Sequence, residues 1–469
     1  MDRRILMAGL VPVVFGCCQE KNQPRNVLFI MVDDLRPSFG CYGDSVAVTP
    51  RVDAFASGAT VYSNAYCQQA LSGPTRASLL TGLRPSETGV TELNTWMRER
   101  NPDIVTLPQA FRSAGYETVS VGKTFHGARN TLDSLSWSRT PLLYRYTKND
   151  EYQLSRNKTG KKAAAYEFTA EPEDGYLDVK IRNEAVRQMR ELSESGKPFF
   201  LAVGFLKPHL PFCAPERFLD LYADASIGQT DTARIKGAPA LAYHDSDELR
   251  GYTDIPAIGP MEMGQNEALK RAYYACVSFA DENIGVLLRE LERLGLFDDT
   301  VVVLLGDHGY HTGEQGLWCK STNYEAACRA PLIIRDPDNA SGRTVSVPVE
   351  FVDIFPTVAG MCGISLPEGL QGKDLRNLDE DGNHYAFSQF PRPYNALHNA
   401  RVRTHSGYAV RDTAWRYVEW YDNSGKLSAS ELYYLGGSGL EKENLSGKPG
   451  YGEQEARLAG VLRAGFMLD

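Results

Sequence analysis

The sequence lacks the features that would assign it at once to several common protein classes. No uninterrupted apolar run approaches the roughly 20 residues that a membrane-spanning helix requires. The nine cysteines include no Cys-x-x-Cys pair, so they indicate no thiolate metal site. Those that follow the N-terminal segment are scattered, and their spacing leaves any disulfide pairing open. The sequence also contains no internal repeat and no low-complexity tract.

An excess of basic residues is missing as well. The 469 residues include 50 basic and 59 acidic side chains, a net charge of −9, and the sequence pI is about 5.5. This balance excludes nucleic-acid binding through bulk positive charge, and we expect no nucleic-acid partner. It also opposes long-range attraction of an anionic substrate. The hydrophobic fraction of 42% is that of an ordinary globular protein, which excludes a disordered chain or a collagen.

The first residues resemble a bacterial export signal. Two arginines precede an apolar run, 5–15, which is followed by Gly16-Cys17. The segment 14–17 resembles a lipoprotein box, in which Cys17 is lipidated; a plain signal peptide that is removed together with Cys17 is the alternative. We therefore predict a leader at 1–24. The mature protein is expected in the periplasm or as an outer-membrane lipoprotein, with membrane contact only through the lipid anchor.

Four short apolar runs predict buried parallel strands. They are too short for helices, and polar groups follow each of them. The runs span residues 27–32, 118–121, 199–205 and 301–305. Helical periodicities at 179–192 and 267–294 lie between them, and this alternation indicates an α/β protein with a mostly parallel sheet. Ligands of such sheets bind beyond the carboxyl ends of the strands, where all four polar clusters fall.

Three carboxylates and a histidine at these strand ends predict a metal site. Asp33 and Asp34 follow the first run, and Asp307 and His308 follow the last. Converging carboxylates repel one another unless a cation lies between them. Oxygen-rich ligation favours calcium or magnesium, whereas the imidazole nitrogen is less typical of calcium. The sequence therefore predicts one divalent ion, and these residues leave its identity open.

The segment 72–82 places a serine and an arginine at the start of a predicted helix. Pro74 falls in the first turn, where its missing N–H does no harm. The free N–H groups and the helix dipole then face any anion beside Ser72, and Arg76 lies on the same face of the helix. Taken alone, this pattern is better explained by an ordinary serine cap on a structural helix.

The same segment resembles a known family signature. Residues 72–76, Ser-Gly-Pro-Thr-Arg, and the Leu-Thr-Gly at 80–82 resemble the (Cys/Ser)-x-Pro-x-Arg signature of the type I sulfatases. The resemblance runs from about residue 25 to about 435, and segments 120–126 and 313–320 are similar to the iduronate-2-sulfatase subgroup. It implies an alkaline-phosphatase-like α/β sandwich. The large, mostly parallel central sheet would be flanked by helices, and a smaller C-terminal subdomain would hold an antiparallel sheet.

The resemblance also implies a sulfuric ester hydrolase that uses a formylglycine, made from Ser72 by a serine-type sulfatase-maturing enzyme. The family's metal ligands correspond to Asp33, Asp34, Asp307 and His308. Its catalytic side chains correspond to Ser72, Arg76, Lys123, His126, His209 and Lys320. The two lysines would bind sulfate oxygens and the arginine would orient the nucleophile. His209 is the expected general acid and His126 the expected base, or the reverse, and Lys207 would assist at the leaving group.

Two structural units are expected after the leader. The catalytic domain is predicted at 25–375 and a C-terminal subdomain at 376–469, where segments 407–412 and 415–420 alternate like antiparallel strands. The polar stretches 129–176 and 221–262 are long for loops, and we expect them to shape the mouth of the pocket.

The implied substrate is a sulfated oligosaccharide. Similarity to the iduronate-2-sulfatase subgroup implies exo-acting removal of a 2-O-sulfate from a non-reducing-end uronic acid of heparan, heparin or chondroitin fragments, either iduronate or its 4,5-unsaturated form. The uronate carboxylate needs a cation, for which the candidates are Arg392, His398, Arg401 and His405. Three alternatives stay open: a sulfatase for another sulfate position, a phosphate or phosphonate monoester hydrolase of the same fold, and a lipid-anchored glycan-binding protein.

Overall fold

A seven-stranded sheet forms the centre of the computed structural model, which describes residues 24–227, 230–259, 261–436 and 439–468. Most of the predicted leader, including Cys17, lies outside the described residues. The sheet has the order β12-β2-β11-β8-β1-β6-β4. Its strands are β1 (Asn26–Val32), β2 (Thr60–Tyr62), β4 (Glu117–Gly122), β6 (Phe199–Phe205), β8 (Thr300–Gly306), β11 (Leu332–Arg335) and β12 (Arg343–Val345).

The four predicted strands are confirmed, and they are consecutive neighbours in the sheet. β8, β1, β6 and β4 pair in parallel, whereas β11 runs antiparallel to both of its neighbours. The predicted mostly parallel α/β sheet is therefore confirmed. The sequence pattern did not predict β2, β11 or β12, because strands of three or four residues carry little periodicity.

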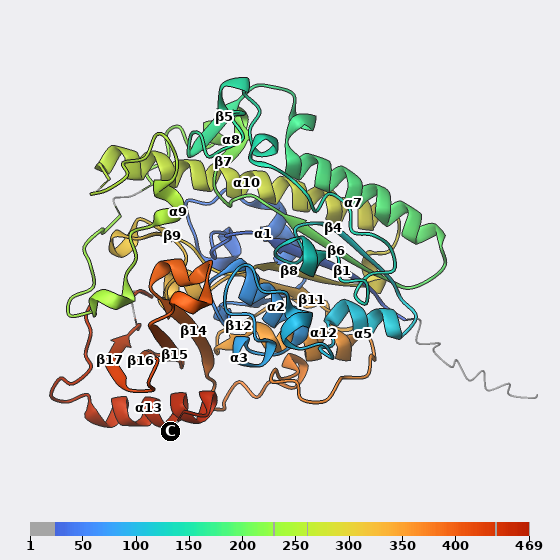
Figure 1. Cartoon of the computed structure of the whole chain (residues 1–469). Coiled ribbons are helices and arrows are strands. Elements are labelled where there is room, and N and C mark those ends of the chain that lie inside the picture. The colour runs from blue at the N-terminus through green and yellow to red at the C-terminus, as the bar shows by residue number, and fades with distance from the viewer. Residues whose placement is uncertain (1–23, 228–229, 260, 437–438, 469) are drawn as a thin grey trace, which may run out of the picture.

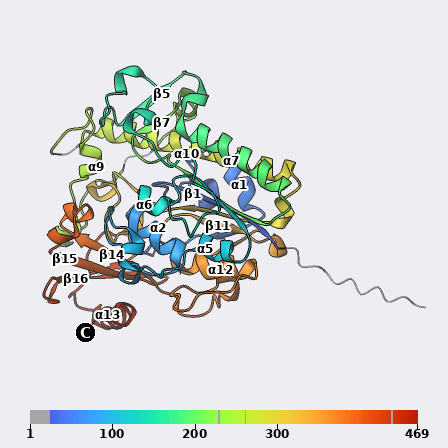
Figure 2. The ribbon, with the colours of Figure 1, turned by 45° about the vertical axis from the view of Figure 1, so that its right-hand side comes forward.

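Helices cover both faces of the sheet because alternate residues of each strand point to opposite sides. In β1, Leu28 and Ile30 pack into the core cluster with helices α7 (Leu177–Glu194) and α10 (Met263–Arg293). The neighbouring residue Phe29 packs into the cluster on the other face. That face is covered by α2 (Ser72–Thr81), α5 (Leu107–Ser113) and α12 (Ile354–Met361), as Figures 1 and 2 show. Within the described part of the chain, no helix is long and apolar enough to cross a membrane.

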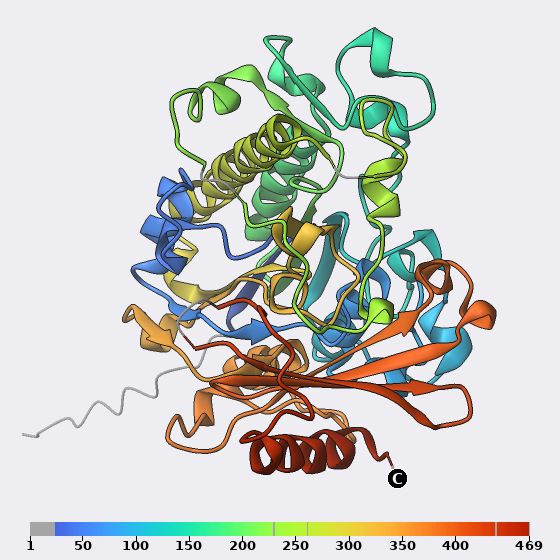
Figure 3. The same cartoon turned by 90° about the vertical axis from the view of Figure 1, so that its left-hand side faces the viewer.

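A second sheet lies beside the α/β layers. Strands β14 (Ala386–Arg392), β15 (His405–Arg411), β16 (Trp415–Asp422) and β17 (Leu427–Tyr434) pair in antiparallel order, as the alternating segments predict. Helix α13 (Gly452–Phe466) covers its outer face (Figure 3). Arg416 of β16 reaches the α/β layers, where its guanidinium lies 2.7 Å from Glu325. This buried ion pair fastens the antiparallel sheet to the larger unit.

Candidate active site

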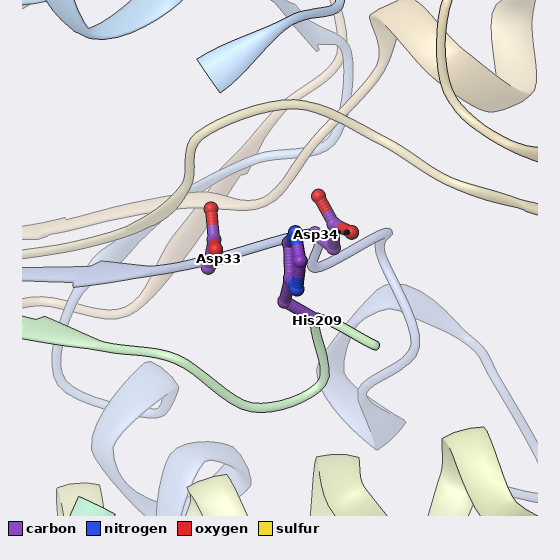
Figure 4. A group of neighbouring side chains, drawn as sticks. All are labelled: Asp33, Asp34 and His209. Carbon is purple, nitrogen blue, oxygen red and sulfur yellow. Dashed lines mark ion pairs between the residues drawn. The ribbon is translucent and has the colours of Figure 1, made fainter. Parts of the chain in front are cut away.

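The polar groups at the carboxyl ends of the predicted strands converge. Asp33 and Asp34 follow β1, and Asp307 and His308 follow β8, the parallel neighbour of β1. One ligand atom from each of Asp34, Asp307 and His308 lies within 4.8 Å of the others, and all three side chains are buried. Asp33 and Asp34 form a second such group with His209, which reaches them from the loop after β6 (Figure 4).

The buried aspartates are matched by cations. Lys123 Nζ lies 2.5 Å from Asp33 Oδ2, and Lys320 Nζ lies 2.9 Å from both carboxylate oxygens of Asp34. Burial, the largest single effect, raises the pKa of Asp33, but Lys123, His209 and Arg76 together outweigh it and hold that pKa well below the usual range. A carboxylate cluster that stays ionised in the protein interior presents oxygen ligands to a metal ion.

The donor set fits a hard divalent cation. Three ionisable carboxylates and one imidazole, drawn from the ends of two adjacent strands, offer the oxygen-rich ligation that calcium and magnesium prefer. Asp34 has a positive φ of 60°, a conformation that non-glycine residues adopt rarely. Its backbone N–H donates to Asp307 Oδ1 at 3.0 Å. The two strand ends are thus locked together around the cluster.

Ser72 is the first residue of α2 and faces this cluster. Its hydroxyl donates to Asp33 Oδ1 at 3.1 Å and lies 3.3 Å from His308 Nε2. The residue that precedes the helix is Leu71, and no side chain caps this helix end. The serine therefore does not act as a cap, and the hydroxyl is directed at the predicted metal ligands instead.

Arg76 lies one turn further along α2 and is completely buried. Its Nε lies 3.0 Å from Asp307 Oδ2 and its Nη2 lies 3.2 Å from Asp33 Oδ1. The guanidinium also donates to the backbone carbonyls of Lys123 and Thr124. It therefore ties the helix that carries Ser72 to the ends of β1, β4 and β8.

A cavity of about 280 Å³ opens above Ser72. Six predicted site residues line it: Ser72, Lys123, His126, His209, Lys320 and His398. Lys162 enters from the polar stretch 129–176, and Asp247 and Glu248 enter from the stretch 221–262. Both long stretches therefore shape the cavity, as the sequence predicts.

The two histidines predicted to transfer protons have different surroundings. His209 Nδ1 lies 2.6 Å from the carbonyl oxygen of Leu210, and its Nε2 lies 3.1 Å from Glu248 Oε1. His126 Nδ1 is buried and has no hydrogen-bond partner in the described part of the chain. Burial, reinforced by the charge of Lys123, lowers the pKa of His126 to about 3. His126 is therefore a neutral imidazole, whereas the His209 ring lies between two oxygen acceptors.

The structure gives the other predicted substrate residues different contacts. Lys207 Nζ donates to the backbone carbonyls of His209 and Pro211, at 2.8 and 2.7 Å, and is absent from the cavity lining. The buried Arg392 guanidinium donates to backbone carbonyls, including that of Ser321 at 3.0 Å. These two residues hold neighbouring loops together. Their charges were visible in the sequence, but the direction of each side chain was not.

Arg401 and His405 also lie away from the described lining of the cavity. Arg401 lines a separate surface hollow between Tyr421 and the end of α13. His405 begins β15, where its Nδ1 lies 3.0 Å from the Thr404 hydroxyl. Of the four cations proposed for a uronate carboxylate, His398 is the one that lines the cavity over Ser72.

No sequence motif singles out Lys162 and Glu248, two charged residues that line the cavity. Glu248 lies on the short helix α9 (Asp247–Arg250) and contacts Lys320 Nζ at 2.9 Å. Burial, the largest single effect, raises the pKa of Glu248, but Lys320 and His209 together outweigh it and lower that pKa well below the usual range. Lys162 Nζ donates to the backbone carbonyl of Glu248 at 2.5 Å and lies over the ring of Tyr252.

The fold and the site define a hydrolase in which a buried nucleophile position lies beside a divalent-metal cluster and two lysines for an anionic group. The Sulfatase family profile matches residues 25–364, and a profile described as N-sulphoglucosamine sulphohydrolase, C-terminal, matches residues 313–464. The chain therefore belongs to the sulfatase family. It is 32% identical to iduronate 2-sulfatase of Homo sapiens, in an alignment that covers 94% of this chain and 96% of the relative.

Solved structures show the same fold. A protein in complex with its substrate D-glucosamine-2-N,6-O-disulfate superposes with a TM-score of 0.75 at 23% identity, covering 95% of this chain and 98% of its own. The phosphonate monoester hydrolase of Silicibacter pomeroyi superposes with a TM-score of 0.76 at 22% identity, covering 95% and 96% of the two chains. The predicted alkaline-phosphatase-like fold is confirmed.

Proposed function

We propose that this sulfatase removes the 2-O-sulfate of a uronic acid at the non-reducing end of a glycosaminoglycan fragment. The observation that carries the proposal is the arrangement of one small cavity. Lys123 and Lys320 lie beside Ser72 and the metal ligands, and Lys162 and His398 add two further cationic or basic groups to the same lining. A sugar that carries both a sulfate and a carboxylate matches this lining, with Lys123 and Lys320 for the sulfate and Lys162 and His398 for the carboxylate. The 32% identity to human iduronate 2-sulfatase supports this choice.

The side chains around Ser72 prepare sulfate transfer. Lys123 and Lys320 bind the sulfate oxygens and stabilise the negative charge that develops on them. Asp33, Asp34, Asp307 and His308 would hold one divalent ion, with calcium as the expected metal, and the ion would supply further positive charge beside the sulfate. The hydrate of a formylglycine made from Ser72 would supply two hydroxyls. One attacks sulfur, and deprotonation of the other later expels the sulfate and restores the aldehyde. Arg76 holds this position against the strand ends.

The surroundings of the two histidines support one assignment of the proton transfers. The backbone carbonyl of Leu210 can only accept, so His209 Nδ1 donates to it and Nε2 is the atom directed into the cavity. We assign His209 as the general acid that donates a proton to the departing sugar oxygen. The neutral His126, with its unpartnered Nδ1, accepts the proton in the second stage.

The proposed substrate fits a small exo-acting site. The net charge of −9 opposes binding of a long polyanion, whereas Lys123 and Lys320 in the cavity lining attract a single sulfated end. We further propose a serine-type maturing enzyme as the partner that modifies Ser72. A lipid anchor at Cys17 and a periplasmic or outer-membrane location complete the proposal.

Two measurements test the function. Mass spectrometry of the Ser72 peptide from the native host is expected to show formylglycine, and an unmodified serine throughout contradicts the mechanism. Purified protein is then assayed on unsaturated disaccharides that differ only in sulfate position. Release of the 2-O-sulfate alone supports the proposal. Release of only 6-O- or N-sulfate, or hydrolysis of a phosphonate or phosphate monoester in place of the sulfate esters, replaces it with one of the alternatives.

A further inference from the structure

Glu248 joins two groups of the proposed reaction that come from different loops. Its Oε1 lies 3.1 Å from His209 Nε2, and its Oε2 lies 2.9 Å from Lys320 Nζ. We propose that Glu248 is a positioning residue, whose carboxylate holds the general acid His209 and the sulfate-binding Lys320 in the relative placement that leaving-group departure requires. This inference rests on the proposed function, because it assigns a role within that reaction.

The segment that carries Glu248 is fastened to the segment that carries Lys320. The His244 ring lies 2.6 Å from the backbone carbonyl of Lys320, so its Nε2 donates to that oxygen. The Ser246 hydroxyl accepts from the backbone N–H of Trp318 at 3.0 Å. Glu248, two residues further on, then reaches the Lys320 ammonium. Three alternate residues therefore align the two segments, and the carboxylate of Glu248 has a defined place.

The charge of Glu248 is unfavourable for the substrate and needs a compensating role. An additional carboxylate in an anion-binding cavity weakens the binding of a sulfated uronate. Glu248 is not the only carboxylate partner of Lys320, because Asp34 also offers it two oxygens at 2.9 Å. With a side chain 18% exposed, Glu248 is also not required to fill the core. Contact with both His209 and Lys320 is the feature that accounts for its presence.

The step that depends on this contact is the departure of the sugar. An oxygen of the formylglycine hydrate bonds to sulfur as the bond between sulfur and the sugar oxygen breaks. The electron pair of the broken bond stays on the sugar oxygen, which takes the proton of His209 Nε2. Leu210 fixes one side of the imidazole through its carbonyl. Before the ester binds, Glu248 accepts from Nε2 and holds that edge of the ring toward the cavity. Once the ester is bound, the same N–H is donated to the sugar oxygen. The same carboxylate holds Lys320, which binds the sulfate and so keeps the ester oxygen beside the His209 ring.

The test uses two sulfate esters with different leaving groups. A sugar 2-sulfate leaves as a poor alkoxide and needs protonation, whereas 4-nitrophenyl sulfate leaves as a stable phenolate and does not. We compare Glu248→Gln with the wild type, both converted at Ser72, and measure kcat, KM and the melting temperature. We expect Glu248→Gln to lower kcat on the sugar sulfate about tenfold or more, with an upper bound at the roughly 10²–10⁴-fold that general-acid catalysis contributes as a whole. Its kcat on 4-nitrophenyl sulfate should change less than about threefold, with an unchanged melting temperature.

Two further variants define the comparison. His209→Ala should show the same leaving-group pattern with a larger loss. Asp245→Asn removes an equal charge from the same segment, at an exposed side chain that pairs with Arg250, and should leave both substrates unaffected. Glu248→Asp keeps the carboxylate on a shorter stem and should recover part of the loss on the sugar sulfate.

The outcomes separate this inference from the function on which it rests. Equal losses on both esters, a change in KM alone, or no change would each overturn the role of Glu248. A wild-type enzyme that hydrolyses 4-nitrophenyl sulfate but no sugar 2-sulfate would instead overturn the proposed substrate. In that case Glu248→Gln is compared on whichever alkyl sulfate the wild type accepts.

Discussion

Arg76 Nε lies 3.0 Å from Asp307 Oδ2, although 230 residues separate the two in the chain. This ion pair is fully buried and places a residue of the nucleophile helix against the end of a central strand. The same guanidinium contacts Asp33, so one side chain links α2 with both strands that carry the metal ligands. The geometry of the candidate site and the stability of this end of the sheet therefore depend on the same contact.

Replacing Arg76 with methionine should cost both activity and stability. The substitution leaves the carboxylates of Asp33 and Asp307 without their shared partner, and breaking a buried ion pair in this way typically costs about 3–5 kcal/mol. We expect a lower free energy of unfolding in urea and a loss of sulfate-ester hydrolysis. Arg187→Met is the control, since that arginine is exposed on α7 and pairs with Glu191. A variant at Arg76 as stable as this control would contradict the structural role.

Removal of the metal should abolish activity without unfolding the protein. Asp33 and Asp34 keep their contacts with Lys123 and Lys320 when no ion is bound, so the fold retains partners for its buried carboxylates. We expect about one divalent ion per chain by elemental analysis, and loss of that ion and of activity in chelator. Binding linkage predicts a lower melting temperature in chelator and its recovery when calcium is added.

An aspartate variant checks where that ion binds. Asp307→Asn should lower the metal content, because it removes one negative ligand from the cluster. Asp298→Asn, on an exposed side chain that pairs with Arg335, should leave the metal content unchanged. Equal metal contents in the two variants would place the ion elsewhere.

Lys162 should contribute to recognition of the uronate carboxylate. A hydrogen bond to a charged group contributes about 1.5–3 kcal/mol, so Lys162→Met should raise KM for a uronate 2-sulfate about 10- to 100-fold. A substrate whose carboxyl is reduced to the alcohol should not show this increase. Lys161→Met removes an equal charge from the neighbouring exposed residue and is the matched control. If Lys162→Met raises KM equally for both substrates, Lys162 does not bind the carboxylate.

The stability of the protein should fall as the pH rises through about 7, in part because of Asp281. Burial raises the pKa of this carboxyl to about 7, even though the backbone N–H groups of Arg51 and Val52 donate to it. A folded-state pKa above the unfolded value stabilises the fold below about pH 4, and this contribution is lost as the pH passes the folded pKa. Asp281→Asn should therefore flatten the decline in the unfolding free energy between pH 5 and 8.

The neighbouring carboxylate provides the contrast for this measurement. The Glu282 pKa is lowered by its hydrogen bond to Arg217, so its contribution to stability is lost only as the pH falls below the usual range of a glutamate. Glu282→Gln should leave the slope between pH 5 and 8 as in the wild type. A slope unaffected by Asp281→Asn would assign the decline to other buried carboxyls, such as Asp353, whose pKa is also raised to about 7.

The sequence by itself determined the central strands and the residues at their carboxyl ends. Parallel strands carry continuous apolar runs, and their ends meet at one edge of the sheet, so the local pattern was enough to place Asp33 and Asp307 together. The signature at Ser72 and Arg76 added the nucleophile position. These predictions work because they depend on local pattern and on one general rule of sheet topology.

Tertiary structure decided which charges line the cavity. Lys162 and Glu248 come from polar stretches without periodicity, and their place depends on contacts such as that between Ser246 and Trp318. Arg392, a plausible cation by sequence, instead donates to backbone carbonyls. A sequence pattern gives the type of a side chain but not the direction in which its loop turns it, and that direction is set by hydrogen bonds between segments far apart in the chain.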